Sequence, residues 1–271
     1  MTDELHTKVA IVTGGSSGIG RATVEALHGA AASVLIADVD IDRGQELADS
    51  LGTRAAFHAT DVADRDQVAD LITTAVTRFG GLDIMVNNAA IASPLRRLLD
   101  DDFDDFHRVT SVNMLGVMTG TRYAAEYMAE QRSGCIINMA SIGGMLAGTG
   151  VATYRATKAA VIHFTKCAAI ELAQYDIRVN AISPGNIPTP LLASSASPDQ
   201  RAEMDRYERK IRDRMRADRP LQRDGTSQDV AEAVLYFASE RARYLTGVIL
   251  PVDGGITAGK PAHRAATAPN P

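Results

Sequence analysis

Short apolar runs alternate with longer amphipathic segments along the 271 residues of this chain. The runs predict β-strands, and the segments between them show the spacing of apolar residues that is typical of helices. The predicted strands are 9–12, 34–37, 55–57, 84–86, 135–137, 177–179 and 248–250. The predicted helices are 19–31, 41–51, 65–79, 101–131, 155–174 and 227–239. Because the strands are apolar on both faces, the pattern predicts an α/β fold: a doubly wound, seven-stranded parallel sheet with helices on both faces.

One internal segment departs from this alternation. Residues 186–224 are rich in proline at first and then strongly charged, and we interpret them as a helical excursion between the sixth and seventh strands. The last residues, 259–271, are rich in alanine, proline and glycine, which is typical of a loose tail. We therefore expect one domain over residues 1–258, including the excursion, followed by the tail.

Composition and charge exclude several classes of function. With 45% hydrophobic residues the chain can bury a sizeable core, and a net charge of −5 without a basic stripe argues against nucleic acid as a partner. The polar N-terminal residues predict no signal peptide, and no apolar run approaches the roughly 20 residues of a membrane span. Cys135 and Cys167 have no cysteine close by in the sequence, and the six histidines show no paired ligand spacing. We expect a cytoplasmic protein with no membrane partner and no metal site.

The first predicted strand runs directly into a glycine-rich turn, Thr13 to Gly20 (Thr-Gly-Gly-Ser-Ser-Gly-Ile-Gly), which a helix follows. Glycines at this junction let backbone N–H groups approach a diphosphate, and the helix N-terminus favours an anion there. Asp38 ends the second strand, where an acid can accept hydrogen bonds from the adenine ribose of a dinucleotide. Its carboxylate would repel a 2′-phosphate, so the sequence predicts NAD rather than NADP.

Tyr154 and Lys158 lie four residues apart, at the start of a predicted helix. Residues with this spacing share one helix face, so the ammonium can lie beside the phenol. A free tyrosine titrates near pH 10, and a neighbouring cation lowers the pKa toward neutrality. The pair therefore indicates a tyrosine that acts as an acid or base.

These motifs together resemble the short-chain dehydrogenase/reductase family, and the resemblance covers nearly the whole chain. Ser141 comes thirteen residues before Tyr154, as the catalytic serine of that family does. Two motifs depart from the usual form, with Ala90 in place of a glycine and Thr157 in place of a serine. Further matches are Thr13–Gly20, Asp61-Val62, Asn87-Asn88-Ala89-Ala90, Asn113, Pro184-Gly185 with Thr189, and Gly247–Gly255.

The resemblance implies a Rossmann fold and a hydride transfer between NAD and an alcohol or ketone. It implies catalytic roles for four residues: Asn113, Ser141, Tyr154 and Lys158. Tyr154 would exchange a proton with the substrate oxygen, Ser141 would hydrogen-bond that oxygen, and Lys158 would lower the tyrosine pKa and hold the nicotinamide ribose. Asn113 would hold a water that links the lysine to solvent.

The cofactor-binding residues that we expect are Gly14, Ser16, Ser17, Gly18, Ile19, Gly20, Asp38, Asp61, Val62, Asn88, Ala89, Ala90, Tyr154, Lys158, Pro184, Gly185, Ile187 and Thr189. The expected substrate pocket comprises Ala92, Ser93, Ile142, Gly143, Met145, Asn186, Leu191 and Leu192. Because these residues are mostly apolar, they favour a secondary alcohol or ketone on a hydrophobic or cyclic body, of hydroxysteroid or cyclic-alcohol type.

Several alternatives remain open. A 3-oxoacyl thioester reductase usually runs on NADPH, which Asp38 disfavours. Enoyl reductases similar to this chain space the tyrosine and lysine more widely, and extended epimerases and dehydratases have a different glycine motif and a longer chain. An NAD-binding redox sensor without catalysis would lack the tyrosine–lysine pair.

Three further features have simpler interpretations. The acidic run Asp100–Asp105 is expected to open a helix, where acids interact favourably with the helix dipole. Arg96 and Arg97 are interpreted as a solvated surface pair. The helices predicted at 101–131 and 155–174 are apolar on more than one face, and in similar proteins such helices pair across a dyad. The resemblance thus implies a homotetramer, with a dimer as the alternative.

Overall fold

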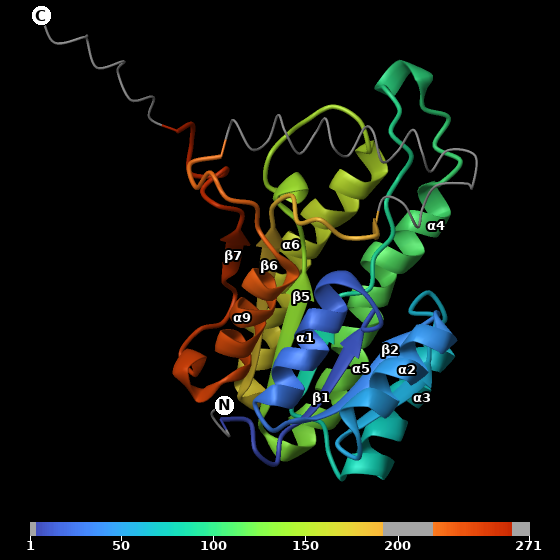
Figure 1. The fold of residues 1–271 in the computed structure, drawn as a ribbon, viewed down its shortest axis with the longest axis vertical. Coiled ribbons are helices and arrows are strands. Elements are labelled where there is room, and N and C mark those ends of the chain that lie inside the picture. The colour runs from blue at the N-terminus through green and yellow to red at the C-terminus, as the bar shows by residue number, and fades with distance from the viewer. Residues whose placement is uncertain (1–3, 192–218, 262–271) are drawn as a thin grey trace, which may run out of the picture.

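A computed structural model describes residues 4–191 and 219–261 of the chain (Figure 1). Seven parallel strands form one sheet in the order β3-β2-β1-β4-β5-β6-β7, which confirms the predicted fold class. The chain order reverses between β1 and β4, so the loops that follow these two strands diverge above the sheet. The strands are β1 (Val9–Thr13), β2 (Ser33–Asp38), β3 (Ala55–Ala59), β4 (Ile84–Asn87), β5 (Gly134–Met139), β6 (Ile177–Pro184) and β7 (Ile249–Val252).

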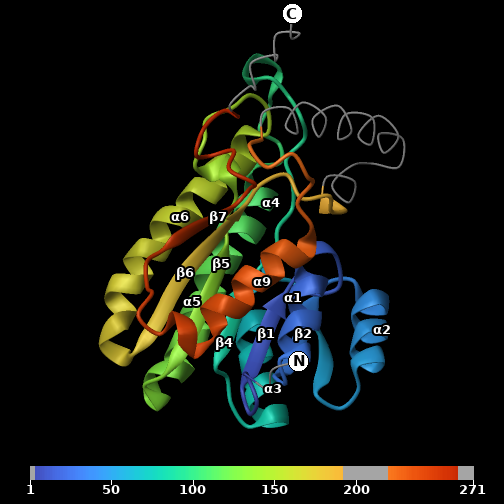
Figure 2. The ribbon, with the colours of Figure 1, turned by 60° about the vertical axis from the view of Figure 1, so that its left-hand side comes forward.

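Helices cover both faces of this sheet (Figure 2). One face packs against α1, α2 and α9, and the other against α3, α5 and α6. The longer described helices are α1 (Gly18–Gly29), α2 (Ile41–Leu51), α3 (Arg65–Phe79), α5 (Gly116–Gln131), α6 (Ala152–Leu172) and α9 (Ser227–Ala238). Among the described residues, no helix is both long enough and apolar enough to span a membrane.

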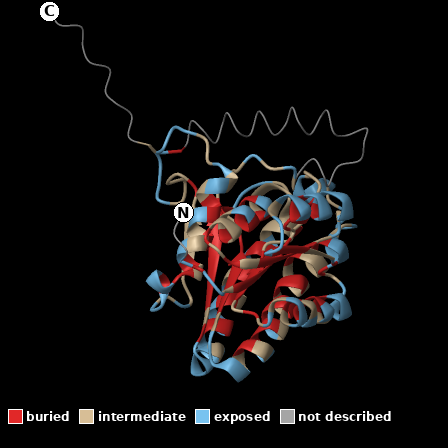
Figure 3. Ribbon diagram, turned by 60° about the horizontal axis from the view of Figure 1, so that its bottom comes forward, coloured by how far each residue is buried: buried red, intermediate tan, exposed pale blue. Residues whose placement is uncertain are grey.

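The side chains of each strand point alternately to the two faces of the sheet, which explains why helices cover both faces. In β1, Ala10 and Val12 belong to the core under α1 and α9, whereas Val9 and Ile11 belong to the core under α3 and α5. All four side chains are buried, as Figure 3 shows for the centre of the sheet. Side chains of a strand point alternately to its two faces, so a strand without polar positions requires a helical layer on each side.

Four buried polar side chains join the middle strands to the helices of one face. Asn87 donates from Nδ2 to Oδ1 of Asn138 (2.9 Å), and Asn138 donates from Nδ2 to the Thr165 hydroxyl (3.0 Å). Thr121 of α5 also accepts from Asn87. Since β4, β5, α5 and α6 each contribute one member, the network helps to set their relative positions just below the loops that follow the strands.

The strand predictions are confirmed, with small extensions at their ends, but one predicted helix boundary is wrong. The helix expected over 101–131 begins only at Phe106, as the short helix α4 (Phe106–Thr110). It continues through a π-helical turn, Ser111–Leu115, into α5. The acidic run ends at Asp105, the N-cap residue of this helix, whereas Asp101 and Asp102 lie in the preceding loop and accept hydrogen bonds from its backbone N–H groups. Most of the segment interpreted as a helical excursion, and most of the expected tail, lie outside the described residues.

We expect the substitution Asn138→Leu to destabilise the protein by about 2–3 kcal/mol. The change removes three buried hydrogen bonds, to Asn87, Thr121 and Thr165, and each typically contributes about 1 kcal/mol. Chemical denaturation monitored by circular dichroism would measure the loss. Thr165→Val, which removes one hydroxyl from the same network, should cost about 1 kcal/mol. A free energy of unfolding for Asn138→Leu within about 0.5 kcal/mol of wild type would contradict the proposed role of the network.

Candidate active site

The candidate site lies at the carboxyl ends of β1, β4, β5 and β6, where the order of the strands reverses. Thr13, the last residue of β1, binds the loop after β4: its hydroxyl accepts hydrogen bonds from the backbone N–H groups of Asn88 (3.0 Å) and Ala89 (3.1 Å). Asn88 in turn donates from its amide to the carbonyl oxygens of Thr13 and Gly14. These bonds hold the glycine-rich turn against the neighbouring loop.

The glycine-rich turn has a backbone that larger residues could not adopt. Gly14 has a φ of +62°, in the left-handed region. At Gly20, a Cβ atom would stand 1.9 Å from the carbonyl oxygen of Gly14. Ser17, which precedes α1, makes no side-chain capping bond, so the first backbone N–H groups of the helix have no side-chain acceptor there. This combination suits an anionic group, such as a diphosphate, at the helix N-terminus.

Asp38, at the end of β2, is tied to the same turn. One carboxylate oxygen accepts hydrogen bonds from the backbone N–H (3.0 Å) and the hydroxyl (2.6 Å) of Ser16, and the other accepts from the N–H of Asp40 (3.1 Å). The carboxylate is therefore fixed in place beside the turn, half-buried at the edge of the cavity described next.

A cavity of about 440 Å³ extends from this turn to Tyr154. We call it the cofactor cavity. All eighteen residues expected to bind the cofactor lie along it, from Gly14 after β1 to Thr189 after β6. Ala90 has no left-handed backbone, so the alanine that replaces the usual glycine fits without strain.

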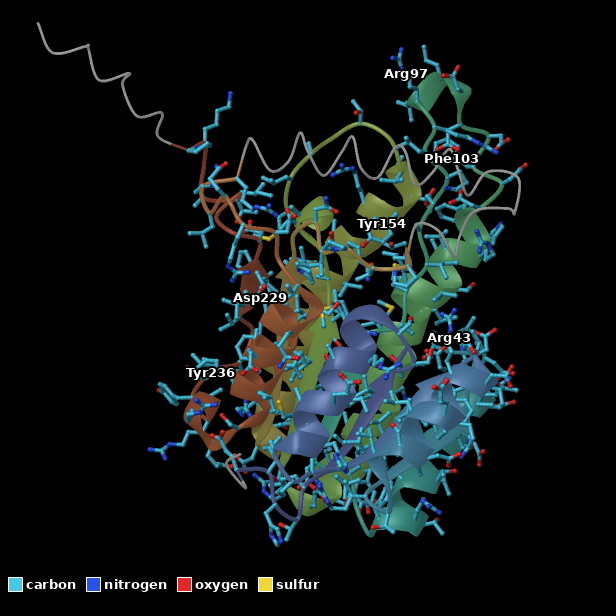
Figure 4. All side chains as sticks on the ribbon, in the orientation of Figure 1. Arg43, Arg97, Phe103, Tyr154, Asp229 and Tyr236 are labelled. Atoms are coloured by element: carbon cyan, nitrogen blue, oxygen red, sulfur yellow. The ribbon has the colours of Figure 1, made fainter. Side chains whose placement is uncertain are left out.

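Tyr154 stands at the inner end of the cofactor cavity, in the first turn of α6 (Figure 4). Tyr154 is half-buried, and the loss of hydration in this position raises its pKa above the ordinary value. A hydrogen bond with Ser141 and the positive charge of Arg155 act in the opposite direction. The expectation that Lys158 lowers this pKa stays a prediction, since the groups that lower it in this structure are Ser141 and Arg155.

Lys158 faces the phenol ring of Tyr154. The Nζ atom is 5.7 Å from the centre of the Tyr154 ring and donates a hydrogen bond to the carbonyl oxygen of Met139 (2.8 Å). The side chain is only 1% exposed, and burial lowers the pKa of Lys158 to about 8. The amine therefore anchors α6 to the end of β5.

Ser141 and Asn113 flank this pair. Ser141 follows β5 and accepts a hydrogen bond from the backbone N–H of Gly143 (3.0 Å). The Asn113 amide, fully buried in the π-helical turn, both accepts from the N–H of Ile91 (2.8 Å) and donates to its carbonyl oxygen (2.9 Å). It also donates to Thr157 (3.4 Å), so in this structure Asn113 positions the loop after β4. Its role in holding a water stays a prediction.

A second cavity, of about 330 Å³, opens beside the first. We call it the substrate cavity; both cavities include Ser141 and Tyr154 in their walls. Among the residues expected to form a substrate pocket, Ala92, Ile142, Gly143, Asn186 and Leu191 lie in this wall.

Three of the expected pocket residues do not lie in that wall. Ser93 is buried behind Tyr154, where its hydroxyl accepts a hydrogen bond from the tyrosine N–H (3.1 Å). Met145 is not part of the wall and is substantially exposed, and Leu192 lies outside the described residues.

Sequence reasoning missed other residues of the substrate cavity. These residues are Ala147, Val151, Arg155 and Ile256. Arg155 is the only lining residue with a positive charge within the described part of the chain. It stands directly after the tyrosine of the tyrosine–lysine pair, and this position next to a candidate catalytic residue is the only sequence signal that could have drawn attention to it.

Two other sequence features lie away from both cavities. Arg97 is exposed on the loop that projects beyond the sheet, together with Phe103, and Figure 4 shows both well separated from Tyr154. Arg96 forms an ion pair with Asp102 of the same loop. The interpretation of the arginines as surface residues agrees with this placement.

Comparisons with known proteins agree with this geometry. A family model described as enoyl-(acyl carrier protein) reductase matches residues 14–257. The cis-4-hydroxycyclohexanecarboxylate dehydrogenase of Sinomonas cyclohexanicum is 38% identical, over 95% of this chain and 100% of that protein. The (+)-borneol dehydrogenase 2 of Salvia officinalis is 38% identical, over 92% of this chain and 89% of that protein.

A reductase of fatty-acid type and a solved structure are also similar. The 3-oxoacyl-(acyl-carrier-protein) reductase FabG of Thermotoga maritima is 35% identical, over 93% of this chain and 98% of that protein. The crystal structure of levodione reductase superimposes with a TM-score of 0.87 at 30% identity, covering 94% of this chain and 99% of the other. These similarities extend over almost the whole chain, not over the glycine-rich turn alone.

We expect the buried Lys158 to make stability depend on pH. The folded protein releases the lysine proton near pH 8, whereas the unfolded chain keeps it up to about pH 10.5. Between these values the unfolded state binds more protons, so stability should rise with pH. Relative to Lys158→Met, the free energy of unfolding of wild type should increase by about 1 kcal/mol per pH unit, as measured by denaturation at pH 7, 8, 9 and 10. If the difference in unfolding free energy between wild type and Lys158→Met stayed constant over this range, the pKa of Lys158 would not be lowered in the folded protein.

Proposed function

This chain belongs to the short-chain dehydrogenase/reductase family, and we propose that it is an NAD-dependent enzyme that interconverts a secondary alcohol and a ketone on a hydrophobic or cyclic body. The observation that carries the proposal is the shared wall of the two cavities. Ser141 and Tyr154 present their hydroxyls where a dinucleotide in one cavity and a substrate in the other would meet. The names of two relatives, which act on a hydroxycyclohexanecarboxylate and on borneol, support a cyclic alcohol.

The cofactor cavity fits a dinucleotide. The left-handed Gly14, the close approach at Gly20 and the uncapped start of α1 would receive the diphosphate. Asp38 would accept hydrogen bonds from the adenine ribose, and Lys158 would lie near the nicotinamide ribose at the other end of the cavity. When bound, the oxidised nicotinamide accepts a hydride from the carbon that carries the alcohol.

The residues of this chain supply positioning and a proton acceptor. Ser141 donates a hydrogen bond to the substrate oxygen and orients the reacting carbon. Tyr154, as the phenolate, takes the alcohol proton as the C–H bond breaks and the carbonyl forms; in the reverse direction the phenol returns the proton. Because burial raises the pKa of Tyr154, the charge of Arg155 and the hydrogen bond from Ser141 have to offset part of that shift. Alcohol oxidation should therefore become faster as the pH rises.

A 3-oxoacyl thioester reductase is the second candidate, which the similarity to FabG favours. Assays with a panel of neutral cyclic secondary alcohols, hydroxycyclohexanecarboxylates and 3-oxoacyl thioesters, each with NAD(H) and NADP(H), separate the two. Rapid turnover of the thioesters with NADPH and none of the alcohols with NAD would favour the second candidate.

We expect Tyr154→Phe to bind NAD as tightly as wild type and to lose turnover by about 100- to 10,000-fold, because the substitution removes only the group that exchanges the proton. Fluorescence titration with NADH measures binding, and steady-state assays measure kcat. Turnover within tenfold of wild type would remove the tyrosine from the mechanism.

We propose NAD rather than NADP because of the fixed position of the Asp38 carboxylate. Both oxygens of this carboxylate are held by hydrogen bonds, so it cannot easily rotate away from a 2′-phosphate. Arg43 also lies at this end of the cofactor cavity, where it forms an exposed ion pair with Asp40 (3.5 Å). That pairing reduces the positive charge that Arg43 can offer to a phosphate.

The substitution Asp38→Asn tests this preference, because the amide oxygen can still accept hydrogen bonds while the charge is lost. We expect the ratio of kcat/KM with NAD to kcat/KM with NADP to fall at least tenfold from its wild-type value. Asp42→Asn, which removes an exposed carboxylate at the start of α2 outside the cofactor cavity, is the matched control. A wild-type enzyme that prefers NADP would overturn the role of Asp38.

We also propose that the protein forms a homotetramer, or failing that a dimer, in the cytoplasm. Ile170, on α6, is 80% exposed in the single chain, which supports burial of that helix against a second copy. The exposed Cys167 and the buried Cys135 are both free, which suits a reducing compartment. Size-exclusion chromatography with light scattering measures the oligomeric state.

A further inference from the structure

Arg155 places an isolated positive charge in the wall of the substrate cavity. Apart from Tyr154, it is the only titratable residue among the described residues that line this cavity, and none of those residues is a carboxylate. The rest of the wall is mostly apolar. The apolar residues are Ala92, Ile142, Leu146, Ala147, Val151, Ile187, Pro188, Leu191 and Ile256.

The loop after β5 contacts the Arg155 guanidinium but accepts only one hydrogen bond from it. Nη1 donates to the carbonyl oxygen of Leu146 (3.2 Å), and a Cβ atom at Gly148 would lie only 2.6 Å from Nη2. The Nε–H is buried and has no hydrogen-bond acceptor among the described residues. Arg155 also forms no ion pair with any described carboxylate. Of the five guanidinium N–H donors, only one thus has an acceptor among the described residues.

The apolar wall of the substrate cavity strengthens the electrostatic interactions of the Arg155 charge. An apolar wall reduces the screening of a charge by water, so an arginine there interacts more strongly with an anion than a surface arginine does. The planar guanidinium is also suited to pair with a carboxylate through two hydrogen bonds. The same charge already acts on Tyr154, so it lies within electrostatic range of the reacting centre.

We propose that Arg155 binds a carboxylate on the substrate, so that the enzyme acts on a hydroxy or oxo acid whose carboxylate and alcohol are separated by an apolar, ring-sized body. The inference rests on the proposed function and narrows its substrate class from neutral cyclic alcohols to anionic ones. In this proposal Arg155 determines substrate specificity.

The test compares matched substrates within each variant. The probes are 3- and 4-hydroxycyclohexanecarboxylate and the corresponding carboxamides, which keep the ring and the alcohol but lack the charge. Removal of Arg155 also changes Tyr154, and this effect is common to both members of a pair. The ratio of kcat/KM for the acid to kcat/KM for the amide therefore isolates binding of the carboxylate.

We expect a ratio of about 10–100 for wild type, a value near 1 for Arg155→Met and an intermediate value for Arg155→Lys. Arg78→Met is the matched control, since Arg78 is exposed at the end of α3, away from both cavities, and its ratio should equal that of wild type. A wild-type ratio near 1, or an unchanged ratio in Arg155→Met, would overturn the proposal while the proposed function stands.

A binding measurement separates this inference from the proposed function. Cyclohexanecarboxylate, which has no alcohol to oxidise, is titrated calorimetrically into wild type and Arg155→Met. We expect binding to weaken at least tenfold in the variant and to change little in Arg78→Met. If no alcohol of the panel is oxidised, the proposed function fails, and this titration still decides whether Arg155 binds a carboxylate. Equal affinity in wild type and Arg155→Met would refute that role.

Discussion

The buried amine of Lys158 is the interaction on which the rest of the site depends. Its hydrogen bond to the Met139 carbonyl joins the second turn of α6 to the last residue of β5. That single bond fixes two neighbours at once: Tyr154, one helical turn earlier on α6, and Ser141, two residues beyond Met139. A charged group in so dry a place is tolerated only where a carbonyl dipole faces it, so the helix has little freedom to slide along the sheet.

The polar groups around this anchor divide into those that hold the framework and those that face the cavities. Asn113 and Thr13 form hydrogen bonds with the loop after β4. The buried network of Asn87 and Asn138 lies at the ends of the strands next to this loop. Ser141 and Tyr154 instead line both cavities. Because the framework is satisfied internally, the groups that face the cavities are available for a substrate.

Electrostatics at the tyrosine is a balance among several groups rather than the work of one neighbour. Burial raises the pKa of Tyr154, and the opposing contributions come from Ser141 and Arg155. Lys158, the cation that the sequence motif predicts as the partner of the tyrosine, lies against the face of the ring. The arginine therefore connects two properties of the proposed enzyme, the acidity of its phenol and the charge of the substrate it would prefer. A change at this residue would alter both.

The sequence alone determined the seven strands and most helix positions, because apolar periodicity and the conformational freedom of glycine act over a few residues. The tertiary structure decided what depends on distant contacts. Asp101 and Asp102 accept hydrogen bonds from backbone N–H groups of their own loop, and the helix begins only at Phe106. Four-residue spacing placed Lys158 and Tyr154 on one face, but only the packing of α6 on β5 showed where the amine points. Likewise, Arg155 became part of a cavity because the loop after β5 folds around it, which no local pattern encodes.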